Sequence, residues 1–273
     1  MKIYRYWVRE KRLLYGREVD FKAGSDESPE KAREILEQKV SLYRRVVETG
    51  EKPARRGPTG AGGYEAPICE EICETLDPRN IVTRNRYGAL VLNSEELLFL
   101  DIDTVTPTFR EMMLGLLGRM PPVKERILAR VGSLAASPEY ADLGFRVYET
   151  ARGVRVMLSL DAREALLSGR FSAICRRFKA DPLYEMLCIR QGCCRARLTP
   201  KPARIAMKTL VRFRYPGDEE QRRAVEAWVL EYERKSAAYA VCRLRAEYGR
   251  MIHSSAQMYH DRMTRADRDL PLA

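Results

Sequence analysis

One short stretch, residues 96–103, combines a run of apolar residues with two acids and reads Glu-Leu-Leu-Phe-Leu-Asp-Ile-Asp. The run predicts a buried strand that ends in Asp101 and Asp103. Residues i and i+2 of a strand lie on the same face, so the two carboxylates project together. Two like charges side by side cost free energy unless a cation compensates them. The stretch therefore predicts either a Mg²⁺ or Mn²⁺ site or ion pairs with arginines.

The chain divides into four predicted regions around this strand. Residues 1–50 predict two strands and a helix, a small ββα unit, and the glycine-rich stretch 51–66 predicts a linker. Residues 67–217 predict an α+β core with a central, mainly antiparallel sheet flanked by helices. Residues 218–273 predict a helical region that begins with one long helix over 218–247.

Within the core, the pattern predicts several further elements. Residues 67–76 predict a short helix that carries Cys69 and Cys73 one turn apart. A hairpin is expected over 144–160, with its turn at Arg152-Gly153. Residues 195–198 and 208–213 predict strands.

The composition excludes some classes of protein. The apolar fraction of 45% is enough to bury a core, so the chain is not expected to be disordered. No apolar run approaches the roughly 18 residues that span a bilayer, so no membrane partner is expected. Seven cysteines, without a secretory signal, favour reduced thiols in the cytoplasm over disulfides or structural zinc.

The charge balance is strongly basic. Lys and Arg total 49 against 38 Asp and Glu, which gives a net charge of +11. Arg predominates over Lys, and its guanidinium binds phosphate oxygens in pairs. Nucleic acid or a nucleotide polyphosphate is therefore one expected partner, and a solvated basic surface is the alternative.

Two basic segments are candidates for phosphate binding. In the first, Arg152 and Arg155 flank Gly153, which lets a phosphate approach the backbone; an ordinary hairpin is the alternative. In the second, Arg195 and Arg197 share one face of a strand. Cations of the following proline-rich turn extend this second segment, and a solvated face is again the alternative. These turn residues are Lys201 and Arg204.

An acidic strand, an Arg-Gly-x-Arg strand and a basic, proline-rich strand follow one another over about residues 81–215. This order resembles the archaeo-eukaryotic primase superfamily. Its members carry Asp-x-Asp on a strand, then Gly-x-His whose histidine contacts the incoming nucleotide, then a further acid and basic strands. Asp101 and Asp103 correspond to the first motif, and 153–155 to the second. The resemblance implies a core that binds nucleotides or nucleic acid with a divalent metal.

The chain departs from that pattern at Arg155, which stands in place of the histidine, so a degenerate core without catalysis fits as well. The further acid would be Asp161 or Asp181. The whole chain also resembles a bacterial family of unassigned activity, and three parts of it carry this resemblance. These parts are 83–88, 195–202 and 239–243.

Residues 98–105 also resemble the first motif of haloacid-dehalogenase-like phosphatases. That resemblance implies a Mg²⁺-dependent phosphohydrolase with Asp101 as nucleophile and Asp103 as general acid. Residues 156–159 would imitate the second motif, and Lys179 or Lys201 the third.

The two histidines, His253 and His260, lie near the end of the sequence. We expect them on the surface of a terminal helix, and an orienting His260-Asp261 pair is the alternative. The leading hypothesis is thus a primase-like protein that binds nucleic acid or nucleotides, with Asp101 and Asp103 as metal-binding and catalytic residues. A phosphohydrolase and a basic scaffold without enzymatic activity, with a protein partner, remain as alternatives. The expected phosphate ligands are Arg152, Arg155, Arg195, Arg197, Lys201 and Arg204.

Overall fold

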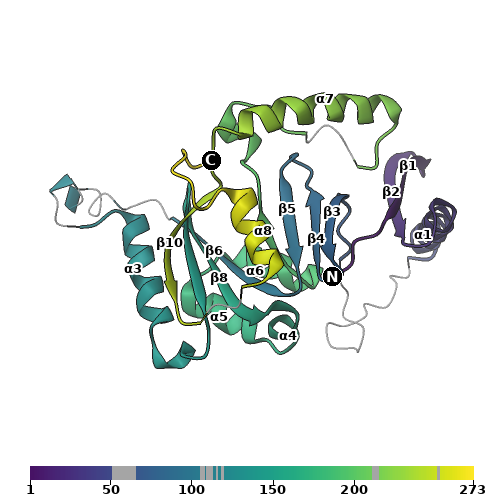
Figure 1. The fold of residues 1–273 in the computed structure, drawn as a ribbon. Helices are drawn as coiled ribbons and strands as arrows, with labels where there is room; N and C mark the ends of the chain where they lie inside the picture. The colour runs from purple at the N-terminus through teal and green to yellow at the C-terminus, as the bar shows by residue number, and fades with distance from the viewer. Residues whose placement is uncertain are drawn as a thin grey trace.

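The computed structural model describes residues 1–50, 66–104, 108, 113–114, 116–117, 120–210, 215–250 and 253–273. In this part of the chain, two four-stranded antiparallel sheets and one two-stranded sheet are flanked by helices (Figure 1). The α+β class and the antiparallel pairing expected from the sequence are confirmed. The expected central sheet consists of two sheets that lie side by side.

Each four-stranded sheet contributes one edge strand to the junction between them. The first sheet has the order β3-β4-β5-β9, and the second has the order β10-β7-β8-β6. Contacts between β6 and β9 join the two sheets. The strands of the first sheet are β3 (Glu71–Asp77), β4 (Asn80–Arg84), β5 (Leu90–Ser94) and β9 (Cys194–Arg197). Those of the second are β6 (Leu97–Asp103), β7 (Phe145–Thr150), β8 (Gly153–Asp161) and β10 (Cys242–Tyr248).

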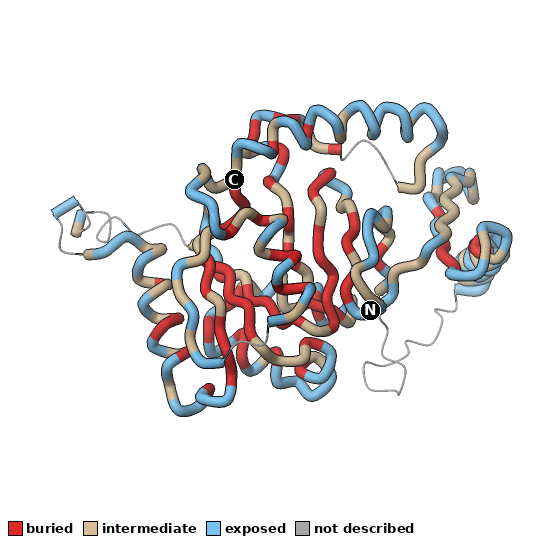
Figure 2. The backbone as a smooth tube through the Cα atoms, in the orientation of Figure 1, coloured by how far each residue is buried: buried red, intermediate tan, exposed pale blue. Residues whose placement is uncertain are grey.

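One continuous hydrophobic core runs under both sheets. Val82 and Leu92 of the first sheet belong to the same buried cluster as Leu98 and Leu100 of the second. Figure 2 shows that the buried residues follow the strands of both sheets. Because apolar burial stabilises the strands from both sides, the acids at the end of β6 sit on a rigid frame.

Helices cover both faces of the sheets. α8 (Ser255–Thr264) lies in front of the sheets in Figure 1, and the ring centroid of its His260 is 5.3 Å from that of Phe99 on β6. α7 (Glu219–Ser236) crosses the top of the same view. Four further helices of this part of the chain are α3 (Val123–Ala135), α4 (Ala162–Leu167), α5 (Arg170–Phe178) and α6 (Pro182–Gln191).

The N-terminal ββα unit is confirmed, with β1 (Tyr6–Leu14), β2 (Arg17–Ser25) and α1 (Pro29–Thr49). The Ser28 side chain accepts a hydrogen bond from the Lys31 amide, and proline occupies the first helical position. The unit has its own small core, built from Phe21, Ala23, Leu36 and Val40. Of the predicted linker after it, only residue 66 lies within the described residues.

The helix predicted over 67–76 is wrong. β3 begins at Glu71 and pairs with β4, and the two strands join through a two-residue turn between Asp77 and Asn80. Proline follows Asp77 in that turn, a tight-turn signal that favours a hairpin. Pairing with β4 therefore outweighs the helical spacing of the two cysteines.

The long helix predicted over 218–247 is wrong in its last part. α7 ends at Ser236, and β10 pairs with β7 in the second sheet. The alternating stretch 242–248 pairs with the main-chain groups of β7, which would otherwise form an open sheet edge. This pairing outweighs the helix propensity of the stretch. Residues 208–210 are not a strand either, and 211–213 of that predicted strand lie outside the described residues.

Among the described helices, none is both long and apolar enough to cross a membrane.

Candidate functional site

The candidate site lies where β6 meets β9. β6 carries Asp101 and Asp103, and its neighbour β8 places Arg155 directly opposite Asp101 in the antiparallel register. β9 ends with Arg197, and the turn after it carries two further cations of the predicted set. These are Lys201 and Arg204, at the 3₁₀ turn Pro202–Ile205. The sequence hypothesis that joined the acids to this basic segment is thus matched by their placement.

Asp101 is held by Arg155. The Arg155 Nε donates to Asp101 Oδ1 at 2.9 Å, and Nη2 donates to Oδ2 at 3.4 Å. Only 4% of the Arg155 side chain is exposed, against 34% for Asp101. Burial lowers the pKa of the Arg155 guanidinium, but the charge and hydrogen bonds of Asp101 raise it above its usual value. The pair is therefore a fixed, charged element of the site.

Arg155 also connects the two sheets. Its Nη1 donates to the main-chain oxygen of Arg197 at 3.0 Å, across the junction from β8 to β9. With Asp101 on one side and this carbonyl on the other, the Arg155 donors are directed into the protein. Its predicted role as a phosphate ligand is therefore less favoured by the geometry than a positioning role.

His260 lies behind Arg155 and is fully buried, so the expected surface position is wrong for this residue. Its Nε2 is 3.5 Å from Arg155 Nη1, and its Nδ1 is 2.9 Å from Asp261 Oδ1. Burial, with the charge of Arg155, lowers the pKa of His260 despite the opposing effect of Asp261. The ring is therefore neutral at pH 7, with Nε2 as acceptor and the proton on Nδ1.

Asp261 completes this buried chain of polar groups. Besides the histidine, it accepts from the Tyr148 hydroxyl at 2.6 Å and from Arg146 Nη2 at 2.9 Å. The alternative noted in the sequence, an orienting His260-Asp261 pair, is the arrangement found. Its connection to Arg155 could not be inferred from the sequence, since α8 and β8 are about a hundred residues apart.

Asp103 has a different environment from Asp101. Burial and the charges of Asp101 and Asp181 raise its pKa, while Lys201 and Arg204 lower it by a smaller amount. Asp103 forms no salt bridge within the described ranges. Asp103 is thus an exposed acid that lies beside two further acids, and the nearby described cations form no salt bridge with it.

Asp181 is the third acid of the site. Its amide donates to the Asp101 main-chain oxygen at 2.9 Å, and its carboxylate caps α6 through the Leu183 amide at 2.9 Å. Asp161, the other candidate, caps α4 and pairs with Arg79, and it is not among the charges that act on Asp103. Of the two acids named from the sequence, the structure brings Asp181 to Asp103.

The cations around Asp103 repel one another. Burial, with Arg155 and Arg204, lowers the pKa of Arg197 to about 10, which leaves it charged at pH 7. Burial and neighbouring cations also lower the pKa of Lys201 and of Arg204; for Arg204 the neighbour is Arg152. In the part of the chain that the structure describes, no Asp or Glu carboxylate lies within 4.0 Å of Arg152, Arg197, Lys201 or Arg204. The Arg197 Nη1 donates to the Thr199 main-chain oxygen at 3.1 Å and to that of Ala273 at 3.4 Å. An anionic ligand would relieve this repulsion.

Arg195 is not part of this group. It forms a salt bridge with Glu70 and lies two residues before Arg197 on β9. Burial lowers the pKa of Arg195, and Glu70 more than compensates. The two arginines of the predicted face therefore differ: Arg195 pairs with a carboxylate side chain, whereas Arg197 donates to main-chain oxygens.

Gly153 serves the packing of β8 against β6. A Cβ at this position would lie 2.1 Å from the Ile102 main-chain oxygen, closer than any real contact. The glycine is therefore required by the close approach of the two strands, which agrees with the ordinary hairpin given as the alternative.

The acids fit a metal only in part. Across the described ranges, no three His, Cys, Asp or Glu side chains converge on one point that a metal ion would occupy. Asp101 already binds Arg155, whereas Asp103 forms no such pair among the described residues, and burial together with its acidic neighbours raises its pKa. Mg²⁺ is commonly held by one or two carboxylates together with substrate phosphates, and Asp103 with Asp181 suits that mode.

Comparison of the chain with family models, with curated protein sequences and with solved structures found no match.

Proposed function

We propose that this protein binds the phosphates of a nucleotide or nucleic acid at the junction of β6 and β9, as a primase-like protein. The observation that carries the proposal is a group of four cations near Asp103, where burial and neighbouring cations lower the pKa of Arg197, Lys201 and Arg204. The four cations are Arg152, Arg197, Lys201 and Arg204. Arginines bind phosphate oxygens in pairs, so a polyphosphate is the ligand class that suits them best.

A divalent cation fits the same proposal. Asp103 and Asp181 would hold Mg²⁺ or Mn²⁺ jointly with the bound phosphates, and the ion would neutralise charge on the phosphoryl groups. The protein's own contribution is to direct Asp103 toward the cations while Asp101 stays bound to Arg155. Metal binding is therefore expected to depend on the phosphate ligand.

The resemblance to the primase superfamily supports this proposal through order and position. The fold brings together the acids of β6, the β8 strand with Arg155 and the basic segment after β9, in the order that the resemblance implies. At the position of the nucleotide-contacting histidine, Arg155 instead binds Asp101. We infer a binding function in which the segment after β9 contacts the phosphates.

The two alternatives differ in what they require of Asp101. A phosphohydrolase needs Asp101 as a free nucleophile, and the hydrogen bonds from Arg155 occupy both of its oxygens. A scaffold would use the acids only in ion pairs; this describes Asp101, but Asp103 has no such partner within the described residues. The geometry around Asp103 therefore favours ligand binding.

The test is calorimetric titration of the full chain with a nucleoside triphosphate, with and without Mn²⁺. We expect binding that Mn²⁺ strengthens and that Arg204→Gln weakens about tenfold, which corresponds to about 1.4 kcal/mol. Arg177→Gln removes the same charge from the exposed face of α5 and is the matched control. Equal affinities of the two variants, or no binding by the wild type, would contradict the proposal.

A further inference from the structure

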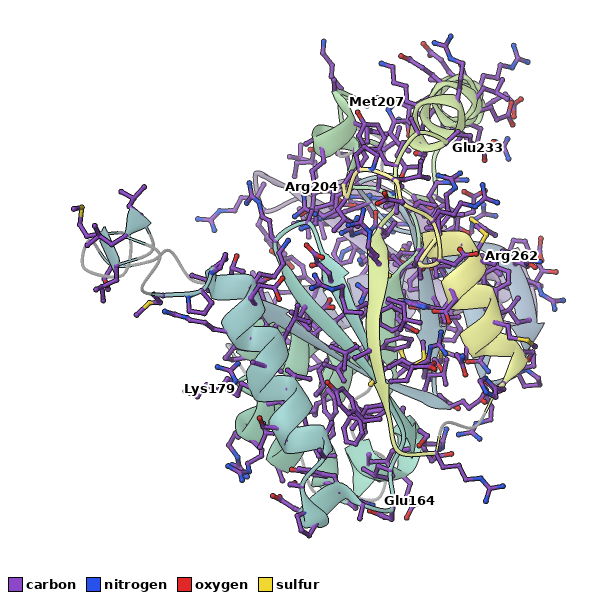
Figure 3. All side chains as sticks on the ribbon, turned by 60° about the vertical axis from the view of Figure 1, so that its left-hand side comes forward. Glu164, Lys179, Arg204, Met207, Glu233 and Arg262 are labelled. Atoms are coloured by element: carbon purple, nitrogen blue, oxygen red, sulfur yellow. The ribbon has the colours of Figure 1, made fainter. Side chains whose placement is uncertain are left out.

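A cavity of about 220 Å³ lies beside the segment that precedes Lys201. Thr199 and Pro200 line it, and α7, α8 and the first sheet supply the other walls. Three arginines from separate parts of the chain face it, with one acid. They are Arg84 of β4, Arg262 of α8, Arg265 after α8, and Glu233 of α7. Figure 3 shows Arg262 and Glu233 on the same side of the molecule.

The arginines of this cavity are fixed mainly by groups without charge. Arg265 donates to the Tyr239 main-chain oxygen at 2.8 Å and to that of Ser236, and Arg84 donates to the Gly88 oxygen at 3.1 Å. The Arg262 guanidinium lies 5.1 Å from the centre of the Tyr259 ring. Contacts with carbonyl oxygens and aromatic rings hold a guanidinium in place but do not neutralise its charge.

Carboxylates compensate these charges only weakly. The Arg84 Nε is 3.7 Å from Glu71, and no salt bridge to Arg262 or Arg265 is found among the described residues. Three arginines against Glu233 leave a local excess of positive charge. The wall of the cavity is thus prepared for an anion.

A buried hydroxyl without a partner among the described residues also faces the cavity. Ser236 is 5% exposed, and its Oγ has no hydrogen-bond partner in that part of the chain. The single proton of the Tyr232 hydroxyl goes to the Pro200 oxygen at 2.5 Å, and its oxygen lies 2.8 Å from Thr199 Oγ1. Burial raises the pKa of Tyr232, and Thr199 and Ser236 lower it by a smaller amount. The Ser236 hydroxyl is thus a further polar group at the wall of the cavity, beside the arginines.

We propose that this cavity binds a phosphate monoester group. A phosphate monoester carries about −1.5 to −2 charges at pH 7 and three acceptor oxygens, which suits three arginines and a hydroxyl donor. At about 30 Å³ for each water of the liquid, the volume has room for a tetrahedral anion of five heavy atoms. The proposal goes beyond the function above, since no residue of this cavity belongs to the group around Asp103.

The experiment is calorimetric titration of the full chain with inorganic phosphate. We expect saturable binding that Arg262→Gln weakens about tenfold, and that Ser236→Ala weakens by a smaller factor. Arg234→Gln removes an exposed arginine of the same helix α7 that does not line the cavity, and it should leave affinity unchanged. Equal loss in Arg262→Gln and Arg234→Gln, or no saturable binding, would overturn the proposal. Circular dichroism verifies that each variant is folded.

A second variant separates this cavity from the site at β6 and β9. Arg204→Gln should weaken nucleotide binding and leave phosphate binding at the cavity intact. Loss of phosphate binding in Arg204→Gln but not in Arg262→Gln would place the phosphate at the other site and overturn the proposal. If nucleotides do not bind at all while Arg262 still governs phosphate binding, the proposed function fails and the cavity site stands.

The source of the phosphate group is resolved with two single strands of the same sequence. Tighter binding of the 5′-phosphorylated strand, abolished in Arg262→Gln, identifies a strand end as the ligand. Equal binding of both strands, with phosphate binding retained, identifies a small phosphate ester.

Discussion

Asp101 and Asp103, two residues apart on β6, have opposite effects on the stability of the folded state. Asp101 compensates the buried guanidinium of Arg155, whereas Asp103 is raised in pKa by burial and by neighbouring acids. Identical residue types on one face of one strand therefore separate into a structural acid and an acid available to a ligand. Matched substitutions at the two positions distinguish these roles.

Asp101→Asn is expected to destabilise the protein. The amide leaves the buried Arg155 without a charged partner, and loss of one member of a buried pair costs about 3–5 kcal/mol. Because 34% of the Asp101 side chain is exposed to water, we expect only about 1–2 kcal/mol. Urea unfolding should show a lower midpoint at an unchanged slope. A midpoint equal to that of the wild type would show that Arg155 does not need this charge.

Asp103→Asn should have the opposite effect. The folded state raises the pKa of Asp103, so its ionised form is less favourable there than in the unfolded chain, where the pKa is about 3.9. This acid therefore lowers stability as pH rises above about 3.9, and the amide removes that loss. We expect a higher melting temperature than the wild type at pH 7 and the same one near pH 3. A lower melting temperature at pH 7 would mean that Asp103 has a cationic partner.

His260→Gln tests the buried chain behind Arg155. The groups that face the ring are Arg155 of β8, Asp101 of β6, Asp261 of α8 and Tyr148 of β7. Their net effect with burial is to lower the pKa of His260, so the unfolded chain binds a proton that the folded chain does not. The wild type should therefore lose stability as pH falls below about 6.5.

The Gln variant should show a flatter dependence of stability on pH between 7 and 5. His253→Gln, at an exposed histidine just before α8, is the control and should keep the slope of the wild type. Parallel profiles for the wild type and His260→Gln would show that this histidine is not the titrating group.

At the scale of elements, the close approach of β6 and β8 depends on Gly153. A methyl group there would meet the Ile102 carbonyl at 2.1 Å, so Gly153→Ala must separate the two strands and disturb the Asp101-Arg155 register. We expect a loss of about 2 kcal/mol or more in the free energy of unfolding.

Gly169→Ala is the matched control for this substitution. Gly169 has a φ of +77°, and no described atom lies within 4 Å of its added Cβ, so only backbone strain of about 1 kcal/mol is expected. Similar losses in the two variants would mean that β6 moves away from β8 at little cost.

The sequence predicted the elements that alternation or capping encodes locally. The β6 strand, the β7-β8 hairpin and α1 with its Ser28 cap each follow from patterns within a few residues. The errors at β3 and β10 have another origin, because both strands depend on partners elsewhere in the fold. β3 pairs across a tight turn, and β10 pairs with β7, about a hundred residues earlier.

The candidate site was predictable to the same degree. Charge and spacing identified the acids of β6 and the basic segment after β9, which the fold brings together. The sequence could not separate Arg195, which pairs with the Glu70 side chain, from Arg197, which donates to main-chain oxygens. It also could not connect His260 to Arg155, since that contact depends on how α8 packs on the sheet.

At the scale of the whole molecule, the net charge of +11 does not describe the binding surface. Many basic residues of the N-terminal unit are paired locally, as Lys31 is with Glu34 and Lys11 with Glu18. The cations around Asp103 repel one another and lack such partners among the described residues. A polyanion should therefore bind through this small group and not through the basic surface as a whole.

This difference predicts how nucleic-acid binding depends on salt. Each phosphate contact with a single strand contributes about 0.7 to the slope of log affinity against log salt concentration. Lys201→Gln should reduce the slope by about that amount and weaken binding of all sequences alike, because a phosphate contact carries no sequence information. Lys31→Gln, which removes the same charge from an exposed ion pair on α1, should leave the slope unchanged. Equal slopes for both variants would mean that the overall charge, and not the junction of β6 and β9, attracts the strand.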